Sequence, residues 1–550
     1  MKIINYLILL IKRRCSQIQF IRHNYKHNHK NLNNTKFDKK IILVEQHHWQ
    51  PLHISFYYLI NYFYKKYDCK IIAYPGHILI SEKIFFNFYK KIQWFLGNFL
   101  KINTFGIYYS LGVYKIIFPK ISNDIKIKSH KIFNSIEKKI VQKSDVLNIN
   151  IDGVEIGDLI YDTFLKLYKL PTIDVLDKKF KKFLWEVINY FYYWDDFFLK
   201  NDVKVLIGSH SVYTIAIPIR IAIKKNIKVY IPHISALYKL DKNYPLADTE
   251  FLHFKKNFST LTENDKKIGI EEAKRRIDLR IQGKVGVDMW YSTKTSFGPI
   301  KERNVLKKND KIKVLIATHC FFDAPNAIGK LLFVDFYEWL LFLGNFSKNT
   351  DYDWYIKTHP DFIPESYSLI TDFLKKFPHI SLIPSDISHH QLKKEGINFA
   401  LTCYGTIGFE YALLGIPVIN ASANNPHINY NFNLHPKNID EYNFLLKNLK
   451  DLKININFSE IYEYYFMMHI YHSKNWIFEN LAKVEETLGG FKKLFNDKIY
   501  DLWLEEFTRE KHENIMSYIE NFIAYDRYKI NYLDIKANLA DEIKKGRNIY

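Results

Sequence analysis

The sequence predicts an α/β protein with two doubly wound, Rossmann-type domains and a helical C-terminal extension. Short apolar runs rich in β-branched residues alternate with polar loops and helical segments, a pattern typical of parallel sheets covered by helices. At 550 residues the chain is too long for one ordinary core, which favours two or three domains. Hydrophobic residues make up 47% of the chain and charged residues 25%, which indicates a globular protein.

Changes in composition divide the chain into five segments. Residues 1–39 form a basic N-terminal segment, and residues 40–245 form the first α/β domain. Residues 246–308 are more polar and are expected to form a linker with a helix. Residues 309–456 form the second, Rossmann-like domain, and residues 457–550 have mostly helical periodicity.

The first domain repeats a unit of strand, polar loop and helix. Its first strand is expected at residues 40–44 and is followed by a helix. A second strand, CKIIAYP, ends in a Pro-Gly turn. The pattern of residues 204–233 then predicts a strand, a loop, a helix and another strand.

The second domain has the clearest pattern, with five strands joined by four helical crossovers in about 110 residues. The strands are expected at residues 311–319, 353–361, 380–384, 398–405 and 416–422. Because crossovers between parallel strands are right-handed, this order predicts one doubly wound sheet.

The charge of the chain indicates an anionic partner. It carries 79 basic and 58 acidic residues, a net charge of +21 with neutral histidines. The sequence contains no nucleic-acid-binding module, zinc-ligand spacing or long basic block, so nucleic acid is not expected. Phosphate-bearing substrates and an anionic membrane surface both remain, and the two are compatible.

Cysteine usage and hydropathy indicate a cytoplasmic location. The four cysteines form no CxxC pair, which disfavours a disulfide framework and a structural zinc site and fits a reducing compartment. The apolar run at residues 6–11 is far shorter than the roughly 20 residues of a membrane span, and no cleavage site follows it. The protein is therefore expected in the cytoplasm, where it could lie peripherally on the inner face of the membrane.

Polar side chains follow the expected strands of the second domain. In an open parallel sheet, ligands bind beyond the carboxyl ends of the strands, so these side chains are candidates for a binding site. His319 and Asp323 follow the first strand, and Lys357, His359 and Pro360 follow the second. Because a residue before proline is held extended, His359 is expected to be a stiff donor at this edge.

The stretch TCYGTIGFEYALLGIPVI, residues 402–419, is expected to end a strand and begin a helix at the same edge. Thr406 is a candidate N-cap, and Gly405 would let a backbone or phosphate group approach closely. Glu410 lies one turn into the helix, where it could accept hydrogen bonds from ribose hydroxyls. The structural alternative is that Thr406 only caps the helix and Glu410 only complements its dipole.

These motifs resemble the C-terminal half of GT-B glycosyltransferases, in particular the bacterial capsule and surface-polysaccharide enzymes that use CMP-activated sugars, the sialyltransferases and Kdo transferases. Those enzymes carry an HP motif and a second Ser/Thr-rich motif that both contact the nucleotide. Here the HP motif is His359-Pro360, and the second motif is Tyr404-Gly405-Thr406, with one Thr in place of a Ser pair. The segment also resembles teichoic-acid polymerases that use CDP-glycerol, which leaves the choice of nucleotide open.

The resemblance covers about 110 residues and implies a GT-B-like fold. It implies that the second domain holds a nucleotide-activated sugar, with a CMP-sugar favoured, and that the first domain holds a glycan or lipid-linked acceptor of a bacterial surface polysaccharide. The donor is a substrate, and no metal or other cofactor is expected, since Lys, His and helix N-termini can stabilise a leaving phosphate. The residues expected to hold the donor are His319, Asp323, Lys357, His359, Pro360, Tyr404, Gly405, Thr406 and Glu410.

An inverting transfer needs a base near the acceptor hydroxyl. Asp158 and Glu155 are the favoured catalytic candidates, because GVEIGD places carboxylates beside glycines in a compact turn, and His210 in GSHSVY is the next. The alternative for each is a surface carboxylate or a capping residue. The other candidates at strand ends and loops of the first domain are Glu45, His47, His48, Asp152 and Asp162.

Several common catalytic motifs are absent from the sequence. It has no GxGxxG after the first strands, no P-loop and no GxSxG, which disfavours hydride transfer, ATP hydrolysis and serine hydrolysis. Two DxD-like spots, at residues 351–353 and 194–198, are expected to be structural. Three alternatives to a glycosyltransferase remain: a CDP-glycerol-type glycerophosphotransferase, a UDP-sugar 2-epimerase and a non-catalytic capsule-assembly protein.

Overall fold

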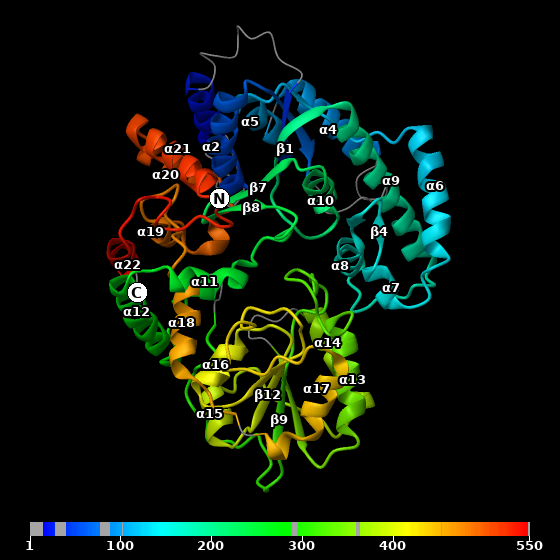
Figure 1. Cartoon of the computed structure of the whole chain (residues 1–550), viewed down its shortest axis with the longest axis vertical. Coiled ribbons are helices and arrows are strands. Elements are labelled where there is room, and N and C mark those ends of the chain that lie inside the picture. The colour runs from blue at the N-terminus through cyan, green and yellow to red at the C-terminus, as the bar shows by residue number, and fades with distance from the viewer. Residues whose placement is uncertain are drawn as a thin grey trace, which may run out of the picture. The chain divides into compact units, whose positions relative to one another are not determined.

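The computed structural model describes residues 15–27, 40–76, 88–101, 103–288, 294–358, 364–452 and 454–547 (Figure 1). The chain divides into two compact units. The first unit consists of Met1–Thr163, Asp174–Ala247 and His472–Tyr550, and the second consists of Phe164–Ile173 and Asp248–Tyr471. The segment boundaries given above remain predictions.

The first unit is built on a six-stranded sheet in the order β3-β2-β1-β6-β7-β8. All neighbouring strands are parallel except β7 and β8, which are antiparallel. The core strands are buried on both faces, which agrees with their continuous apolar sequences. The strands are β1 (Lys40–Gln46), β2 (Lys70–Pro75), β3 (Lys115–Ile116), β6 (Asp202–Ile207), β7 (Lys228–His233) and β8 (Ala236–Leu240).

The strand order of the first sheet reverses between β1 and β6. The crossover through α2 (Gln50–Tyr67) leads from β1 to β2, and the crossover through α10 (Ile217–Lys224) leads from β6 to β7 in the opposite direction. Because such crossovers are right-handed, α2 and α10 cover opposite faces of the sheet. The gap between the carboxyl ends of β1 and β6 is therefore the topological switch point of this sheet.

The remaining elements of the first unit surround this sheet. A two-residue turn joins the short antiparallel strands β4 and β5. The elements are α4 (Phe88–Leu100), α5 (Thr104–Ser110), α6 (Asn123–Glu137), α7 (Lys143–Leu147), β4 (Asn150–Ile151), β5 (Val154–Glu155), α8 (Gly157–Tyr168), α9 (Lys178–Lys200) and the 3₁₀ turn Thr214–Ala216.

The helices of the C-terminal region are divided between the two units. Helix α18 (Phe458–His469) belongs to the second unit, and the later helices belong to the first. Helices α20 and α21 pack on α2, where Trp503 Nε1 donates to Tyr58 Oη at 3.0 Å. The later elements are α19 (Leu481–Leu488), the 3₁₀ turn Phe491–Lys493, α20 (Lys498–Glu506), α21 (Arg509–Ala524) and α22 (Leu539–Arg547).

The second unit contains a five-stranded parallel sheet in the order β11-β10-β9-β12-β13. All five strands predicted for this domain are confirmed, and the order reverses between β9 and β12. The strands are β9 (Lys313–Ala317), β10 (Asp353–Lys357), β11 (Ser381–Leu382), β12 (Phe399–Thr402) and β13 (Val418–Asn420).

Helices cover both faces of the second sheet (Figure 1). One buried cluster joins the sheet to α13, α14 and α17, and a second joins it to α15 and α16. Helix α12, predicted within the polar linker, packs against α18 in the same unit. The elements are the 3₁₀ turn Glu250–His253, α11 (Phe254–Ser259), α12 (Glu263–Ile281), α13 (Phe336–Ser347), α14 (Pro364–Lys376), α15 (His389–Lys394), α16 (Ile407–Leu413), α17 (Ile439–Lys447) and the 3₁₀ turn Leu449–Asp451.

The predicted fold class is confirmed: an α/β protein with two doubly wound, Rossmann-type sheets and C-terminal helices. The two DxD-like spots are also placed as predicted. Asp195 and Asp196 lie inside α9, and Asp353 begins β10 at the end opposite to its carboxyl edge. Within the described residues, no helix is both long and apolar enough to cross a bilayer.

Candidate functional site

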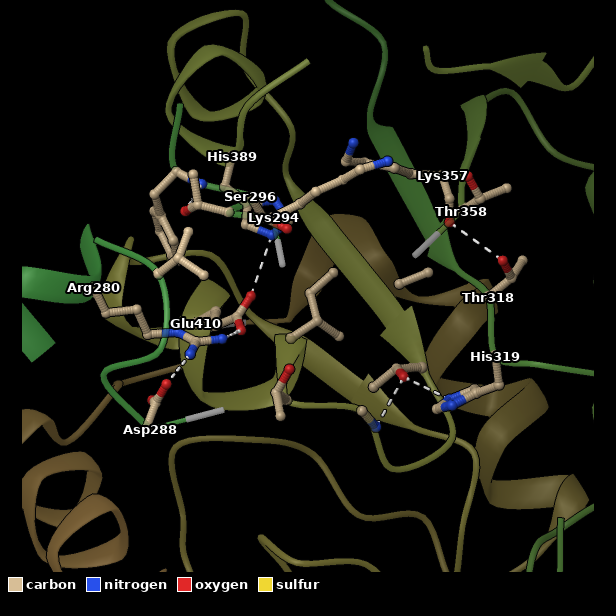
Figure 2. A pocket seen from close by; sticks show the side chains of 18 of the residues that line it. Arg280, Asp288, Lys294, Ser296, Thr318, His319, Lys357, Thr358, His389 and Glu410 are labelled. Carbon is tan, nitrogen blue, oxygen red and sulfur yellow. Dashed lines mark hydrogen bonds and ion pairs between the residues drawn. The ribbon is translucent and has the colours of Figure 1, made fainter. Parts of the chain in front are cut away.

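A pocket lies at the switch point of the second sheet, beside the carboxyl ends of β9, β10 and β12 (Figure 2). Thr318, Lys357 and Thr402 line it from the strand ends, and Thr406 and Glu410 line it from the start of α16. The cavity volume is about 120 Å³. Because pockets that enclose whole drug-sized ligands usually measure about 300–1,000 Å³, this cavity fits one part of a nucleotide, such as its phosphates.

Lys357 brings a buried positive charge to this pocket. It ends β10, its side chain is 4% exposed, and Nζ donates to the carbonyl of Ser385 at 3.2 Å. Among the described residues, no carboxylate lies within ion-pair distance of Nζ. Burial lowers the pKa of Lys357 to about 8, and the charge of Asp386 only partly opposes this. A buried ammonium without a counter-ion in a pocket favours an anionic ligand.

Glu410 is held by a network of charged and polar groups on one wall of the pocket. Arg280, in the last turn of α12, forms ion pairs with both Glu410 and Asp288 (Figure 2). His389 Nε2 lies 3.2 Å from Glu410 Oε2, and His389 Nδ1 lies 2.9 Å from the hydroxyl of Tyr411. Burial alone would raise the pKa of Glu410, but Arg280 and His389 hold it well below its usual value.

This network differs from the expected role of Glu410 as an acceptor for ribose hydroxyls. Glu410 is only 4% exposed and is already engaged by Arg280 and His389. It lines the pocket, but its charge is used to hold these two side chains in place. Burial opposes the charge of Arg280, yet Glu410 and Asp288 keep its pKa above its usual value. The guanidinium therefore stays charged.

His319 lines the pocket and is fixed in one orientation. Its ring stacks on Phe336 with centroids 4.6 Å apart, and its Nε2 accepts from the backbone N–H of Cys403 at 3.2 Å. The hydroxyl of Thr402 lies 3.0 Å from the same nitrogen and accepts from Gly405 N–H at 3.2 Å. Since Nε2 accepts a backbone N–H, the neutral ring carries its proton on Nδ1.

The Gly405-Thr406 turn lies at the expected position, but α16, the helix that it begins, lacks the expected side-chain cap. Thr406 is the N-cap of α16 by position, although its side chain makes no capping hydrogen bond. A Cβ at Gly405 would lie 3.0 Å from Thr402 Oγ1 and 3.4 Å from the ring of His319, which explains the glycine. Helix α16 has seven residues, so its dipole contributes little to anion binding, and Lys357 is the main source of positive potential.

Two other predicted donor-binding residues, Asp323 and Tyr404, do not line the pocket. Asp323 is exposed and pairs with Lys166 at 3.1 Å within the second unit. Tyr404 packs its ring against His319 and Phe336 and donates to the carbonyl of Ala324 at 3.3 Å, so it supports the pocket from outside its lining. The HP motif, His359-Pro360, lies outside the described residues.

Sequence reasoning missed the contribution of the linker to this pocket. Arg280 and Lys284 at the end of α12, and Lys294 and Ser296 beyond it, line the cavity together with the strand ends. Arg280 is brought in by tertiary packing, which helical periodicity does not reveal. The available signal was the basic run EEAKRRIDLRIQGK, which places cations at the end of a helix followed by a glycine.

The favoured base candidates lie together near a hairpin of the first unit. Asp152 and Gly153, with φ of 50° and 79°, make the turn between β4 and β5, whereas the rest of GVEIGD forms β5 and the start of α8 rather than one compact turn. Glu155 is exposed at this hairpin. Asp158, in the first turn of α8, pairs with Arg220 of α10 at 2.7 Å. Among the described residues, neither carboxylate contacts His210.

His210 lies instead at the carboxyl end of β6, beside the switch point of the first sheet. Its Nδ1 lies 2.7 Å from the hydroxyl of Ser209, whose hydroxyl in turn donates to the Glu45 carboxylate at 2.5 Å. The ring of His210 is 6.0 Å from that of His47 and 6.1 Å from that of His233. The structure therefore brings His210 together with Glu45 and His47, two residues that were predicted only as further candidates.

Metal binding has no support from clustering among the described residues. No group of three or more His, Cys, Asp or Glu side chains there has the arrangement of a metal site.

No protein-family model matches the chain, and no curated protein matches it. Similar solved structures include Thermosulfurimonas dismutans KpsC, a beta-Kdo 2,4 transferase, at 13% identity over 49% of this chain and 85% of that chain, with a TM-score of 0.29. A UDP-GlcNAc 2-epimerase from Methanocaldococcus jannaschii, bound to UDP-GlcNAc and UDP, is 14% identical over 77% of this chain and 97% of that chain, with a TM-score of 0.24. A glycosyltransferase from Rickettsia africae ESF-5 is 9% identical over 86% of this chain and 100% of that chain, with a TM-score of 0.24. Scores this low carry no argument about function, which therefore has to be argued from the chain's own residues.

Proposed function

We propose that this protein is a GT-B-type glycosyltransferase that moves a sugar from a nucleotide-activated donor, with a CMP-sugar favoured, to a glycan or lipid-linked acceptor of a bacterial surface polysaccharide. The observation that carries the proposal is Lys357, a buried cation without a carboxylate partner among the described residues, in a pocket at the switch point of a parallel sheet. Anionic ligands of doubly wound sheets bind at this position.

The lining of the pocket suits phosphate rather than a metal. Lys357 uses one of its three N–H donors on Ser385, and the hydroxyls of Thr318, Thr358 and Thr406 border the same cavity. Fixed donors and cations can stabilise the negative charge that develops on a leaving phosphate without a metal ion. Transfer is therefore proposed to be metal-independent, with the nucleotide-sugar as a substrate and no further cofactor.

The proposal also includes a peripheral position at the inner face of the cytoplasmic membrane. The excess of 79 basic over 58 acidic residues would attract nucleotides, anionic acceptors and the anionic inner face of the cytoplasmic membrane. A peripheral position there would bring the protein to lipid-linked acceptors.

Calorimetric titration of the purified chain with CMP, CDP, UDP and GDP, with and without Mg²⁺, tests this proposal. CMP is expected to bind without Mg²⁺, and Lys357→Met is expected to weaken binding by about 10- to 100-fold, since a charge-assisted hydrogen bond contributes about 1.5–3 kcal/mol. Lys313→Met is the matched control, because Lys313 is also a buried lysine of this sheet but begins β9 at the opposite end.

Each other outcome leads to a different function. A preference for CDP would favour a glycerophosphotransferase, and a preference for UDP would favour another glycosyltransferase or a 2-epimerase. If no nucleotide binds, or if Lys357→Met binds as tightly as the parent, the proposed donor site is wrong and a non-catalytic assembly protein becomes the better hypothesis.

A further inference from the structure

The switch point of the first sheet holds a continuous chain of three polar side chains that the donor site does not use. Glu45 lies one residue beyond the last β1 residue that pairs with β6, and Ser209 and His210 follow β6 after Gly208. Glu45 Oε2 accepts from the Ser209 backbone N–H at 2.7 Å, and Oε1 accepts from its hydroxyl at 2.5 Å. The same hydroxyl lies 2.7 Å from His210 Nδ1.

The hydrogen bonds determine which atom donates and which accepts at each step from His210 to Glu45. Since the single hydroxyl proton of Ser209 is donated to Glu45, the bond to His210 requires a proton on Nδ1 of the ring. Nε2 of His210 is then an acceptor, and among the described residues it has no hydrogen-bond partner. The ring is half-buried, so Nε2 can face a ligand. A carboxylate, a hydroxyl and an acceptor nitrogen therefore lie in series.

The surrounding residues hold this geometry. The hydroxyl of Tyr108 donates to the Glu45 carbonyl and accepts from the His47 backbone N–H, both at 2.8 Å. Nε2 of His233 donates to the Ser209 carbonyl at 2.8 Å. A Cβ at Gly76 would lie 2.1 Å from Glu45 Oε1, so the glycine makes room for the carboxylate.

We propose that Glu45, Ser209 and His210 form a proton relay in which His210 is the general base for the acceptor hydroxyl. Nε2 of His210 takes the hydroxyl proton, Nδ1 passes its proton to the Ser209 hydroxyl, and Ser209 passes its own proton to Glu45. This proposal rests on the proposed transferase function for the identity of the hydroxyl. His210 is the catalytic residue, and Ser209 and Glu45 are positioning residues that act through it.

The reaction balances with the groups named. The hydroxyl oxygen of the acceptor forms a bond to the anomeric carbon of the donor sugar. The bond between that carbon and the nucleotide phosphate oxygen breaks, and the phosphate leaves with the electron pair. The relay ends with a neutral Glu45, a neutral His210 that carries its proton on Nε2, and an unchanged Ser209. Glu45 returns the proton to solvent by the reverse passage.

The proton affinities at the two ends of the relay explain why the proton would travel beyond His210. Burial and the neighbouring His233 lower the pKa of His210 to about 3, so an imidazolium is disfavoured. Burial raises the pKa of Glu45 to about 7, even though both hydrogen bonds from Ser209 oppose this. A base whose pKa lies near the working pH is the most efficient, and here Glu45 meets that condition.

The tyrosines around Glu45 stay uncharged near neutral pH. Tyr74 of β2, Tyr108 of α5 and Tyr190 of α9 face Glu45, and burial raises the pKa of each phenol. His47 and His233 face His210 from the ends of β1 and β7. The ring of Trp49 lies 5.4 Å from that of His210 and offers an apolar wall for a sugar ring.

The ring nitrogen signals of His210 in the ¹⁵N-histidine-labelled full chain test the relay without any substrate. We expect the Nδ1-protonated tautomer at pH 8 and a signal shift with a midpoint near pH 7, caused by Glu45. Glu45→Gln should remove this shift, and Ser209→Ala should change the tautomer. Ser211→Ala is the control, because Ser211 is buried in the same loop but accepts from the backbone of Ala247. An Nε2-protonated tautomer in the parent, or a shift that persists in Glu45→Gln, would overturn the relay.

Turnover of CMP-activated sialic acid tests the catalytic role. His210→Ala should lower kcat by about 10²- to 10⁴-fold, the usual contribution of a general base, while CMP affinity stays unchanged. In the parent kcat/KM should fall below pH 7, and Ser209→Ala should lose this inflection. Equal turnover by His210→Ala and the parent would contradict the relay, whereas a parent that binds no nucleotide would contradict the donor site and leave the NMR result to decide on the relay.

Discussion

Each of the two sheets has one buried glutamate beside its switch point, and the two carboxylates have opposite electrostatic surroundings. Glu45 in the first unit is fully buried, and its carboxylate accepts hydrogen bonds from the backbone N–H and the hydroxyl of Ser209, both neutral groups. Glu410 in the second unit is paired with Arg280 and His389. Burial raises the pKa of Glu45 to about 7, whereas the charge of Arg280 and the hydrogen bond from His389 hold the pKa of Glu410 well below its usual value.

The difference shows that the strand order determines where a carboxylate lies, whereas the neighbouring groups determine its pKa and therefore its role. Glu410 keeps a permanent negative charge at neutral pH, and it can only hold other side chains in place. Glu45 can gain and lose a proton near neutral pH, which suits proton transfer. The first unit is therefore the side that we assign to acid–base chemistry, and the second is the side that we assign to anion binding.

The largest effect on stability is expected from removing Arg280, which pairs with the buried Glu410. Arg280→Met leaves a buried carboxylate with reduced compensation, which typically costs about 3–5 kcal/mol of stability. The free energy of unfolding by urea measures this cost. The double variant Arg280→Met with Glu410→Gln should recover most of it, because no buried charge then lacks a partner. If Arg280→Met unfolds at the same urea concentration as the parent, the pairing of Arg280 with Glu410 does not stabilise the pocket.

The pH dependence of stability separates the two glutamates. A group whose folded pKa is raised stabilises the fold below its unfolded pKa, here about 4.5, and loses that contribution as the pH rises through about 7. Glu410, with a lowered folded pKa, stabilises the fold above pH 4.5 and loses this only as the pH falls. Between pH 5 and pH 8, the ionisation of Glu45 should therefore weaken the fold, whereas Glu410 should make no difference.

Glu45→Gln should consequently stabilise the protein at pH 8 by up to about 3 kcal/mol and change little at pH 5. Urea unfolding at both pH values measures the difference. An equal effect at pH 5 and pH 8 would show that Glu45 does not change its charge in this range, and the contrast between the two glutamates would fail.

An intermediate effect is expected at Gly76. The Cβ of Gly76→Ala would displace the Glu45 carboxylate, and overpacking of this kind typically costs about 1–3 kcal/mol. The same substitution should remove the His210 signal shift near pH 7, because the chain to Ser209 is broken. Gly298→Ala is the matched control, since a Cβ there meets nothing within 4 Å. An unchanged His210 titration in Gly76→Ala would contradict the packing role of this glycine.

The smallest effect is expected at an exposed carboxylate. Asp323 pairs with Lys166 at the surface, with both side chains about half exposed, and such pairs contribute about 0–1 kcal/mol. Asp323→Asn should therefore change neither urea unfolding nor CMP affinity by more than this amount. A large loss of CMP affinity would return Asp323 to the donor site, where the sequence had placed it.

Sequence patterns predicted the strands and the edge of the sheet better than they predicted the roles of side chains. The five strands of the second unit follow from short apolar runs separated by polar loops, and the position of Lys357 and Gly405 at strand ends follows directly. Arg280 could not be placed in this way, because it reaches the pocket through the packing of α12.

The same limit applies to the first unit. A turn in GVEIGD was predicted from the sequence. The Asp158 carboxylate, however, forms an ion pair with Arg220, and only the folded structure shows this pair. Glu45 and Ser209 are 164 residues apart, so no local pattern could join them. Knowledge of the strand order would have been enough, since β1 and β6 are neighbours at the switch point.

The most direct test of the central claim, that Lys357 holds the phosphate of the donor, is the affinity for CMP measured by calorimetry between pH 7 and pH 9.5. The pKa of Lys357 is lowered to about 8 by burial, and an anion binds its protonated form. We predict that the affinity is constant below pH 8 and falls up to tenfold per pH unit above it, and that Lys357→Met binds weakly at every pH. An affinity that does not change across this range, with Lys357→Met equal to the parent, would contradict the claim.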